Sequence, residues 1–187
     1  FFDRCGVHSC PPHFWTNDVK TKISYENIRL KKLIEDLVHL ETKPFFQRIG
    51  NASEFVKNFS KWYETQKNIC GGINKNSMVI KHPLMGFVLE DIAHLLQNAC
   101  LVILNRPLHE IEASRLRRKW SPVYGKEGAK LIYDKIEYVK NKLNFPYLEI
   151  SYEQLCNQKK TNEELIKFCD LGTDKRNLKV ASDWLRG

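Results

Sequence analysis

The sequence lacks the long apolar segment that a membrane-spanning helix needs. Such a helix requires about 18 consecutive apolar residues, whereas the longest apolar run, Cys100–Leu104, has the length of a strand. Internal repeats, low-complexity tracts and linkers rich in proline, glycine or serine are also absent. We therefore expect one folded domain over residues 1–187 and no membrane span.

A secretory leader pattern is absent as well, and the chain begins FFDRC without a methionine. The six cysteines are scattered, and three lie in apolar runs where cysteine behaves as a small hydrophobe. These features favour reduced thiols and a cytoplasmic location. The segment CGVHSCPPH holds two cysteines and two histidines, but its spacing matches no standard zinc site, so we expect no metal.

The composition is that of a folded domain with an excess of positive charge. Hydrophobic residues make up 42% and charged residues 28%, which is near the globular average. The net charge of +8 favours anionic partners such as phosphates, sulfated sugars, nucleic acid or an acidic membrane surface. Charge alone does not choose among them.

The hydrophobic periodicity predicts two helices followed by alternating strands and helices. Ser24 is expected to cap the first helix, and Gly71 and Gly72 to follow the end of the second. The predicted helices are a first one up to Val38, then 52–67, 85–98, one from Leu108, 126–143 and 162–172. The predicted strands are 77–83, 100–105 and 147–152.

Strand–helix–strand connections predict a parallel sheet with helices on both faces, that is, a helix-rich, three-layer α/β fold. Ligands of such sheets bind beyond the carboxyl ends of the strands. Polar residues stand at each of these ends: Lys81 and His82, Arg106, and Tyr152. We expect the chemistry of the protein to lie there.

Arg106 and Ser114 are the candidate ligands of an anion. Arg106 ends a strand and Ser114 lies two turns into the next helix, so a guanidinium, the first helical amides and a hydroxyl would suit a terminal phosphate. In the alternative, Arg106 pairs with Glu110 and Ser114 bonds to a carbonyl of its own helix. The basic residues 115–119 complement the helix dipole, although Arg115 and Arg118 share a face that could contact an anion.

The same segment resembles a known nucleotide-binding element. LNRPLHEIEAS is similar to the 3′-phosphate-binding element of sulfotransferases that use 3′-phosphoadenosine 5′-phosphosulfate (PAPS): a strand, Arg-x-Pro, and a serine eight residues after the arginine. VIKHP is similar to the Lys-Asp-Pro strand of that family, and ISYEQL and FCDLG to its Tyr-Glu-Asp-Leu and Phe-Leu-Gly landmarks. These segments follow the family order, and residues 25–37 loosely resemble bacterial members.

The resemblance implies a P-loop NTPase-like sulfotransferase fold, with PAPS as the co-substrate and an unidentified hydroxyl or amine as the sulfuryl acceptor. It implies that Arg106 and Ser114 bind the nucleotide, and that Lys81 and His82 are the candidate catalytic residues, although the family has aspartate where His82 stands. Arg176 and Lys179 resemble, more weakly, a basic loop that closes over the nucleotide.

One element of that family has no counterpart in the sequence. The loop rich in Gly, Ser and Thr that holds the 5′-phosphosulfate is missing, and we expect it, with its strand, to precede Phe1; loss of the loop is the alternative. A rival function is a non-catalytic basic α/β module that binds nucleic acid or another polyanion, but no nucleic-acid motif supports a nucleic-acid partner. A small-molecule kinase of similar fold would need a Walker-type lysine that is not present.

Overall fold

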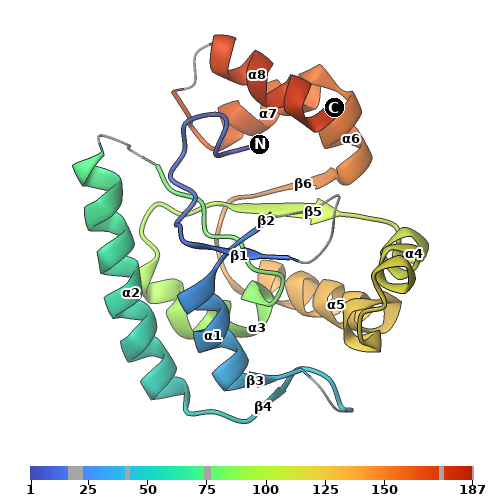
Figure 1. The fold of residues 1–187 in the computed structure, drawn as a ribbon. Coiled ribbons are helices and arrows are strands. Elements are labelled where there is room, and N and C mark those ends of the chain that lie inside the picture. Colours follow the sequence, from blue (N-terminus) through green and yellow to red (C-terminus); the bar gives the residue numbers. More distant parts are fainter. Residues whose placement is uncertain (17–22, 41–42, 74–76, 173–174, 187) are drawn as a thin grey trace.

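The computed structural model describes residues 1–187 except 17–22, 41–42, 74–76, 173–174 and 187. The chain is a helix-rich α/β protein (Figure 1). Its elements are β1 (His13–Trp15), β2 (Ile23–Asn27), α1 (Ile28–Leu37), β3 (Val38–His39), β4 (Gln47–Arg48), α2 (Ala52–Gly72), α3 (Met85–Ile92), η1 (Ala93–Leu95), β5 (Leu101–Asn105), α4 (Leu108–Arg118), η2 (Pro122–Tyr124), α5 (Lys126–Lys142), β6 (Tyr147–Ser151), α6 (Tyr152–Asn157), α7 (Lys159–Phe168) and α8 (Lys175–Arg186).

The parallel pair β5–β6 is the centre of the candidate site. The two strands pair from Leu101 with Tyr147 to Asn105 with Ser151. Helices α4 and α5 form the crossover between them, and α6 to α8 lie on the other side of the pair from α3 and α5 (Figure 1). The predicted strands at 100–105 and 147–152 and their parallel crossover are thus confirmed.

The predicted strand at 77–83 does not join this pair. Its only described pairing is an isolated parallel bridge between His8 and Met78. Met78 packs against the main core and Val79 against the N-terminal cluster, so the extended run is partly buried on both sides without a sheet ladder. The largest sheets within the described residues have two strands, and the fold does not show the expected three-layer parallel sheet.

The first helix begins later than Ser24. Ser24 lies in β2, where its hydroxyl donates to the Phe14 carbonyl, and Asn27 caps α1 instead by accepting the amides of Arg29 and Leu30. Both residue types make good N-caps. Asn27 is favoured because its oxygen also accepts the indole N–H of Trp62.

Other helix ends differ from the prediction by a turn or more. Helix α2 continues through Gly71 and Gly72, since the last turn still bonds, with the Ile73 amide donating to the Ile69 carbonyl. The helix expected at 85–98 is α3 followed by a short 3₁₀ turn, and the helix expected at 162–172 is α7. Helices α6 and α8 and strands β1 to β4 were not predicted.

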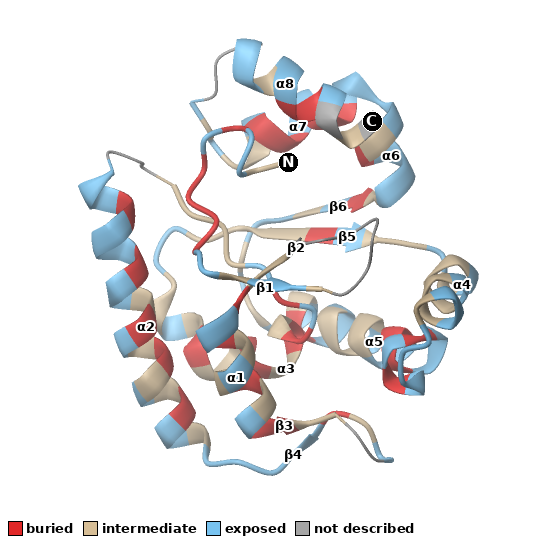
Figure 2. Cartoon of the chain, in the orientation of Figure 1, coloured by how far each residue is buried: buried red, intermediate tan, exposed pale blue. Residues whose placement is uncertain are grey.

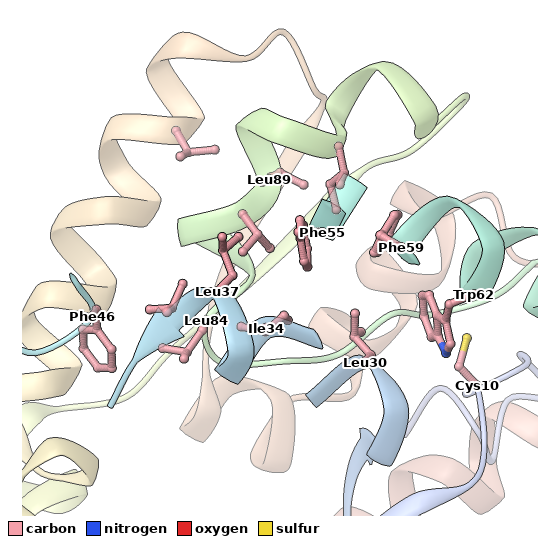
Figure 3. Packing of buried hydrophobic residues seen from close by; sticks show 14 of the residues in the cluster. Cys10, Leu30, Ile34, Leu37, Phe46, Phe55, Phe59, Trp62, Leu84 and Leu89 are labelled. Atoms are coloured by element: carbon pink, nitrogen blue, oxygen red, sulfur yellow. The ribbon is translucent and has the colours of Figure 1, made fainter. Parts of the chain in front are cut away.

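The main hydrophobic core lies between α1, α2 and α3 (Figures 2 and 3). Leu30, Ile34 and Leu37 of α1 recur with helical spacing and are fully buried, and they meet Phe55 and Phe59 of α2. Smaller clusters lie under α7 and beside the N-terminal segment. Among the described helices none is both long and apolar enough to cross a membrane.

Candidate functional site

Arg106 is fixed at the end of β5 by a tyrosine on the crossover helix. The hydroxyl of Tyr133, on α5, accepts the Arg106 amide and donates to the Arg106 carbonyl, each at 2.9 Å. One hydroxyl therefore satisfies both backbone groups at the point where the strand leaves the sheet. No sequence signal marked Tyr133, which follows Ile132 of the inward stripe on α5.

The Arg106 side chain lies between α4 and the start of α6. Its Nε donates to Glu110 Oε2 at 2.9 Å, and its Cζ lies 5.4 Å from the centre of the Tyr152 ring. The ion pair with Glu110 that the sequence offered as an alternative is therefore formed. The terminal guanidinium nitrogens make no hydrogen bond to the described residues, so the outer edge of the group is available to a ligand.

Tyr152 stands beside Arg106 because β5 and β6 end in register. Asn105 pairs with Ser151 at the end of the two strands, so Arg106, which follows β5, and Tyr152, which begins α6, are neighbours. Burial raises the pKa of the Tyr152 hydroxyl, with Cys156 adding to the effect and Arg106 opposing it. The ring is neutral at pH 7 and acts as a platform for the guanidinium.

Helix α4 carries the second candidate, Ser114, on the same face as Glu110 one turn earlier. The helix starts after Pro107, and no side chain among the described residues caps its first amides. The amides of Leu108 and His109 precede the first helical bonds, which run from Glu110 and Ile111 to the Pro107 carbonyl. Arg106 therefore precedes the uncapped start of α4, and Ser114 lies within the helix, two turns after Arg106.

The basic end of α4 is largely engaged in local contacts. Arg115 donates to Glu112 at 2.6 Å and to the Trp120 carbonyl at 3.0 Å. The Arg118 guanidinium lies 4.4 Å from the centre of the Trp120 ring. Lys119 adopts a left-handed conformation that ends the helix. Arg115 and Arg118 thus make the local contacts of a helix end.

Lys81 follows the extended run at 77–80 and is held by the β1–β2 hairpin. Its Nζ lies 2.7 Å from Glu26 Oε1 and 2.9 Å from the Ser24 carbonyl. The side chain is about half exposed. The Lys81 ammonium is therefore paired with a carboxylate and is also in contact with solvent.

His82 is buried and serves the loop that leads into α3. Its Nδ1 accepts the Leu84 amide at 3.2 Å, which leaves the proton on Nε2. Burial, with smaller effects of Lys81 and Lys31, lowers the pKa of His82 to about 3. The imidazole is therefore neutral at physiological pH and is a weak proton acceptor.

The described contacts do not bring the four site residues together in one cluster. Arg106 contacts α4, α5 and the start of α6, whereas Lys81 contacts β2. No hydrogen bond or ion pair within the described parts of the chain joins Lys81 or His82 to Arg106, and none joins Arg106 to Ser114. Arg176 and Lys179 are exposed on α8.

A cleft of about 320 Å³ opens beside Tyr133, between β5, β6 and α5. Its polar lining includes Asp134, Glu137 and Glu149 and no basic side chain. A phosphate would be repelled there, so this cleft is not the anion site. Among the described residues, no three histidine, cysteine, aspartate or glutamate side chains gather in a way that could hold a metal ion.

No protein-family model, curated protein or solved structure matches this chain. Any functional assignment therefore rests on its own residues and their geometry.

Proposed function

We propose that this chain is a sulfotransferase-like domain that binds a 3′-phosphorylated adenine nucleotide through Arg106 and Ser114. The observation that carries the proposal is the placement of Arg106 at the carboxyl end of a parallel strand, facing the start of α4. Parallel sheets bind their ligands at this edge. The order of the motifs in the sequence supports the same assignment.

The arrangement suits a dianionic phosphate. The outer edge of the Arg106 guanidinium offers a two-point contact, the first amides of α4 add the positive end of the helix dipole, and Ser114 adds a hydroxyl. Tyr133 holds the end of β5 in place through its hydrogen bonds to the Arg106 backbone, and the Tyr152 ring contacts the Arg106 guanidinium through a cation–π interaction. Glu110 holds Nε in the absence of an anion and competes electrostatically with it.

In the proposed reaction, a hydroxyl or amine of the acceptor attacks the sulfur of PAPS while the bond from sulfur to the bridging oxygen breaks. The acceptor proton passes to a base, and a cation stabilises the charge on the departing phosphate oxygen. Lys81 is the candidate cation, because its ammonium is solvent-accessible. His82 is a poor candidate base, since its pKa is about 3 and its Nδ1 is already hydrogen-bonded.

The test is thermal stabilisation by 3′,5′-ADP, with 5′-AMP as the matched ligand that lacks the 3′-phosphate. A nucleotide at 100 times its Kd should raise the Tm by about 5–10 °C. Arg106→Ala should abolish this shift, whereas Arg117→Ala, on the exposed side of the same helix, should retain it. Glu110→Gln should preserve or enlarge the shift, because a competing charge is removed.

Three results would refute the assignment. One is a parent protein that responds equally to 3′,5′-ADP and 5′-AMP, or to neither. Another is an equal loss of response in Arg106→Ala and Arg117→Ala. The last is a shift that disappears in Glu110→Gln, which would mean that the ion pair, and not the free guanidinium edge, shapes the site. The melt of each variant without nucleotide separates binding from folding.

A second candidate function, binding of a polyanion without catalysis, is favoured by a groove of about 370 Å³ between α1 and α2. Arg29, Lys32 and Lys61 line its walls, with Asp36 as the one acidic lining residue and Trp62 among the groups beneath. These three cations have no ion-pair partner in the described part of the chain. Three neighbouring cations against one acidic residue give the groove an excess of positive charge, which favours an anionic ligand.

Oligonucleotide binding distinguishes this candidate from the first. With dT₂₀ as the probe, groove binding would show a steep salt dependence and no competition by 3′,5′-ADP. The double substitution Lys32→Glu and Lys61→Glu should abolish binding of the oligonucleotide. The control is the double substitution Lys130→Glu and Lys167→Glu, which changes the net charge by the same amount at exposed residues outside the groove. Equal losses in the two double variants would indicate a non-specific charge effect.

A further inference from the structure

Two cysteines that are far apart in the sequence come together beside the β5–β6 pair. Cys100 immediately precedes β5, and Cys169 ends helix α7. Their sulfur atoms lie 3.9 Å apart although 69 positions separate them in the chain. All six cysteines are free thiols, and the sequence alone favoured independent, reduced residues.

The backbone on both sides of this contact is held by other interactions. The Leu101 amide, next to Cys100, donates to the Pro146 carbonyl at 2.8 Å. The Cys169 amide donates to the Leu165 carbonyl, and Leu165 is buried against Ile150 of β6. The two sulfurs are therefore brought together by the packing of α7 on the strand pair.

The two thiols differ in their chemistry. Hydrogen bonding from Cys169, opposed by burial and aided by the Cys100 amide, lowers the pKa of Cys100 to about 7. The same contact and burial raise the pKa of Cys169. Cys100 therefore carries a substantial thiolate fraction at neutral pH, whereas Cys169 is a thiol. Both are partly accessible, unlike the buried Cys5, Cys10 and Cys70.

We propose that Cys100 and Cys169 form a reactive dithiol site that a hydroperoxide oxidises to a disulfide. The Cys100 sulfur attacks the outer oxygen of the peroxide, the O–O bond breaks, and an alcohol, or water from hydrogen peroxide, leaves. Cys169 then attacks the sulfur of the resulting sulfenic acid, and its hydroxyl leaves as water when the S–S bond forms. Two thiols and one peroxide thus give one disulfide, one alcohol and one water.

The geometry limits the closure that is needed. A disulfide has a sulfur–sulfur bond of about 2.05 Å, so the sulfurs must approach by about 1.9 Å from their separation of 3.9 Å. The bond would tie the start of β5 to the end of α7 and would constrain the unfolded chain between them. For a loop of this length the expected rise in Tm is on the order of 10 °C.

Mass spectrometry after thiol blocking provides the primary test. The reduced protein is treated with a stoichiometric amount of hydrogen peroxide, unfolded in N-ethylmaleimide, digested and analysed. We expect the number of maleimide adducts to fall by two and a cross-linked peptide pair to contain Cys100 and Cys169. Dithiothreitol should restore both adducts and reverse the rise in Tm.

Variants identify the order of the steps. In Cys169→Ser the reaction should stop at the sulfenic acid, so dimedone should label Cys100 at least fivefold more than in the parent. Cys156→Ser, which removes another partly accessible thiol, should leave cross-linking unchanged. Cys100→Ser should abolish both products.

The parent protein alone can overturn the proposal, whether or not a variant folds. An unchanged number of adducts after peroxide treatment would do so. A cross-link that joins either cysteine to Cys156, or equal dimedone labelling of the parent and Cys169→Ser, would also contradict it.

Discussion

His82 should lower the free energy of unfolding of this protein as the pH falls below 6.5, and a substitution at His82 should remove this effect. Burial lowers the pKa of His82 to about 3, from an ordinary value of 6.5. The unfolded chain therefore binds a proton below pH 6.5 that the folded chain does not bind until about pH 3. Stability contributed by this residue is fully present above pH 6.5 and is lost progressively as the pH falls through that window.

The magnitude follows from the two pKa values. Within the window the free energy of unfolding falls by about 1.4 kcal/mol for each pH unit. Between pH 8 and pH 5 the loss through His82 is about 2 kcal/mol, because the folded imidazole is still neutral at pH 5.

The measurement compares urea unfolding of the parent protein and His82→Asn at pH 8 and pH 5. Asparagine retains an acceptor for the Leu84 amide that His82 now binds, but it does not titrate. The parent should lose about 2 kcal/mol more than the variant over this interval. Hydrogen bonding to Lys135 and Lys142 lowers the pKa of Glu90, and its effect is common to both proteins.

Equal losses in the two proteins would refute the buried neutral histidine. A variant that loses more than the parent would reverse the sign of the argument, because it would mean that folding stabilises the protonated imidazole. The first result would restore His82 as a candidate proton acceptor for the proposed sulfuryl transfer.

Two further substitutions test the supports of the site and of the core. Tyr133→Phe removes the hydroxyl that binds both backbone groups of Arg106; urea unfolding should show a loss of about 1–2 kcal/mol, and the stabilisation by 3′,5′-ADP should shrink, whereas an unchanged nucleotide response would mean that Tyr133 does not position the arginine. Asn27→Ala removes the cap of α1 together with buried bonds to Trp62 and the Cys10 carbonyl; it should cost about 3 kcal/mol. Asn51→Ala, at the exposed cap of α2, should cost about 1 kcal/mol, and similar losses at both caps would contradict the role of the buried bonds.

Sequence patterns predicted the structure best where it depends on residues that are close together in the chain. The helical stripe of Phe55, Phe59 and Trp62 predicted the buried face of α2, because helical spacing alone brings these residues to one side. The apolar run before Arg106 predicted a strand and a crossover to a parallel partner, and both are present, although of its residues only Ile103 is buried and Leu104 is exposed. It also placed Arg106 at the strand end, where the guanidinium is found.

The sequence by itself determined the two best-formed strands, the approximate position of most helices and the position of Arg106 at the edge of the sheet, since these depend on periodicity and on residues close in the chain. Only the tertiary structure decided that Arg106 bonds to Glu110 and rests on Tyr152, that His82 is buried and neutral, and that Cys100 meets Cys169. Each of these depends on a choice of contacts or on surroundings that periodicity does not specify, and burial and partner distance then set the charge and reactivity of the groups.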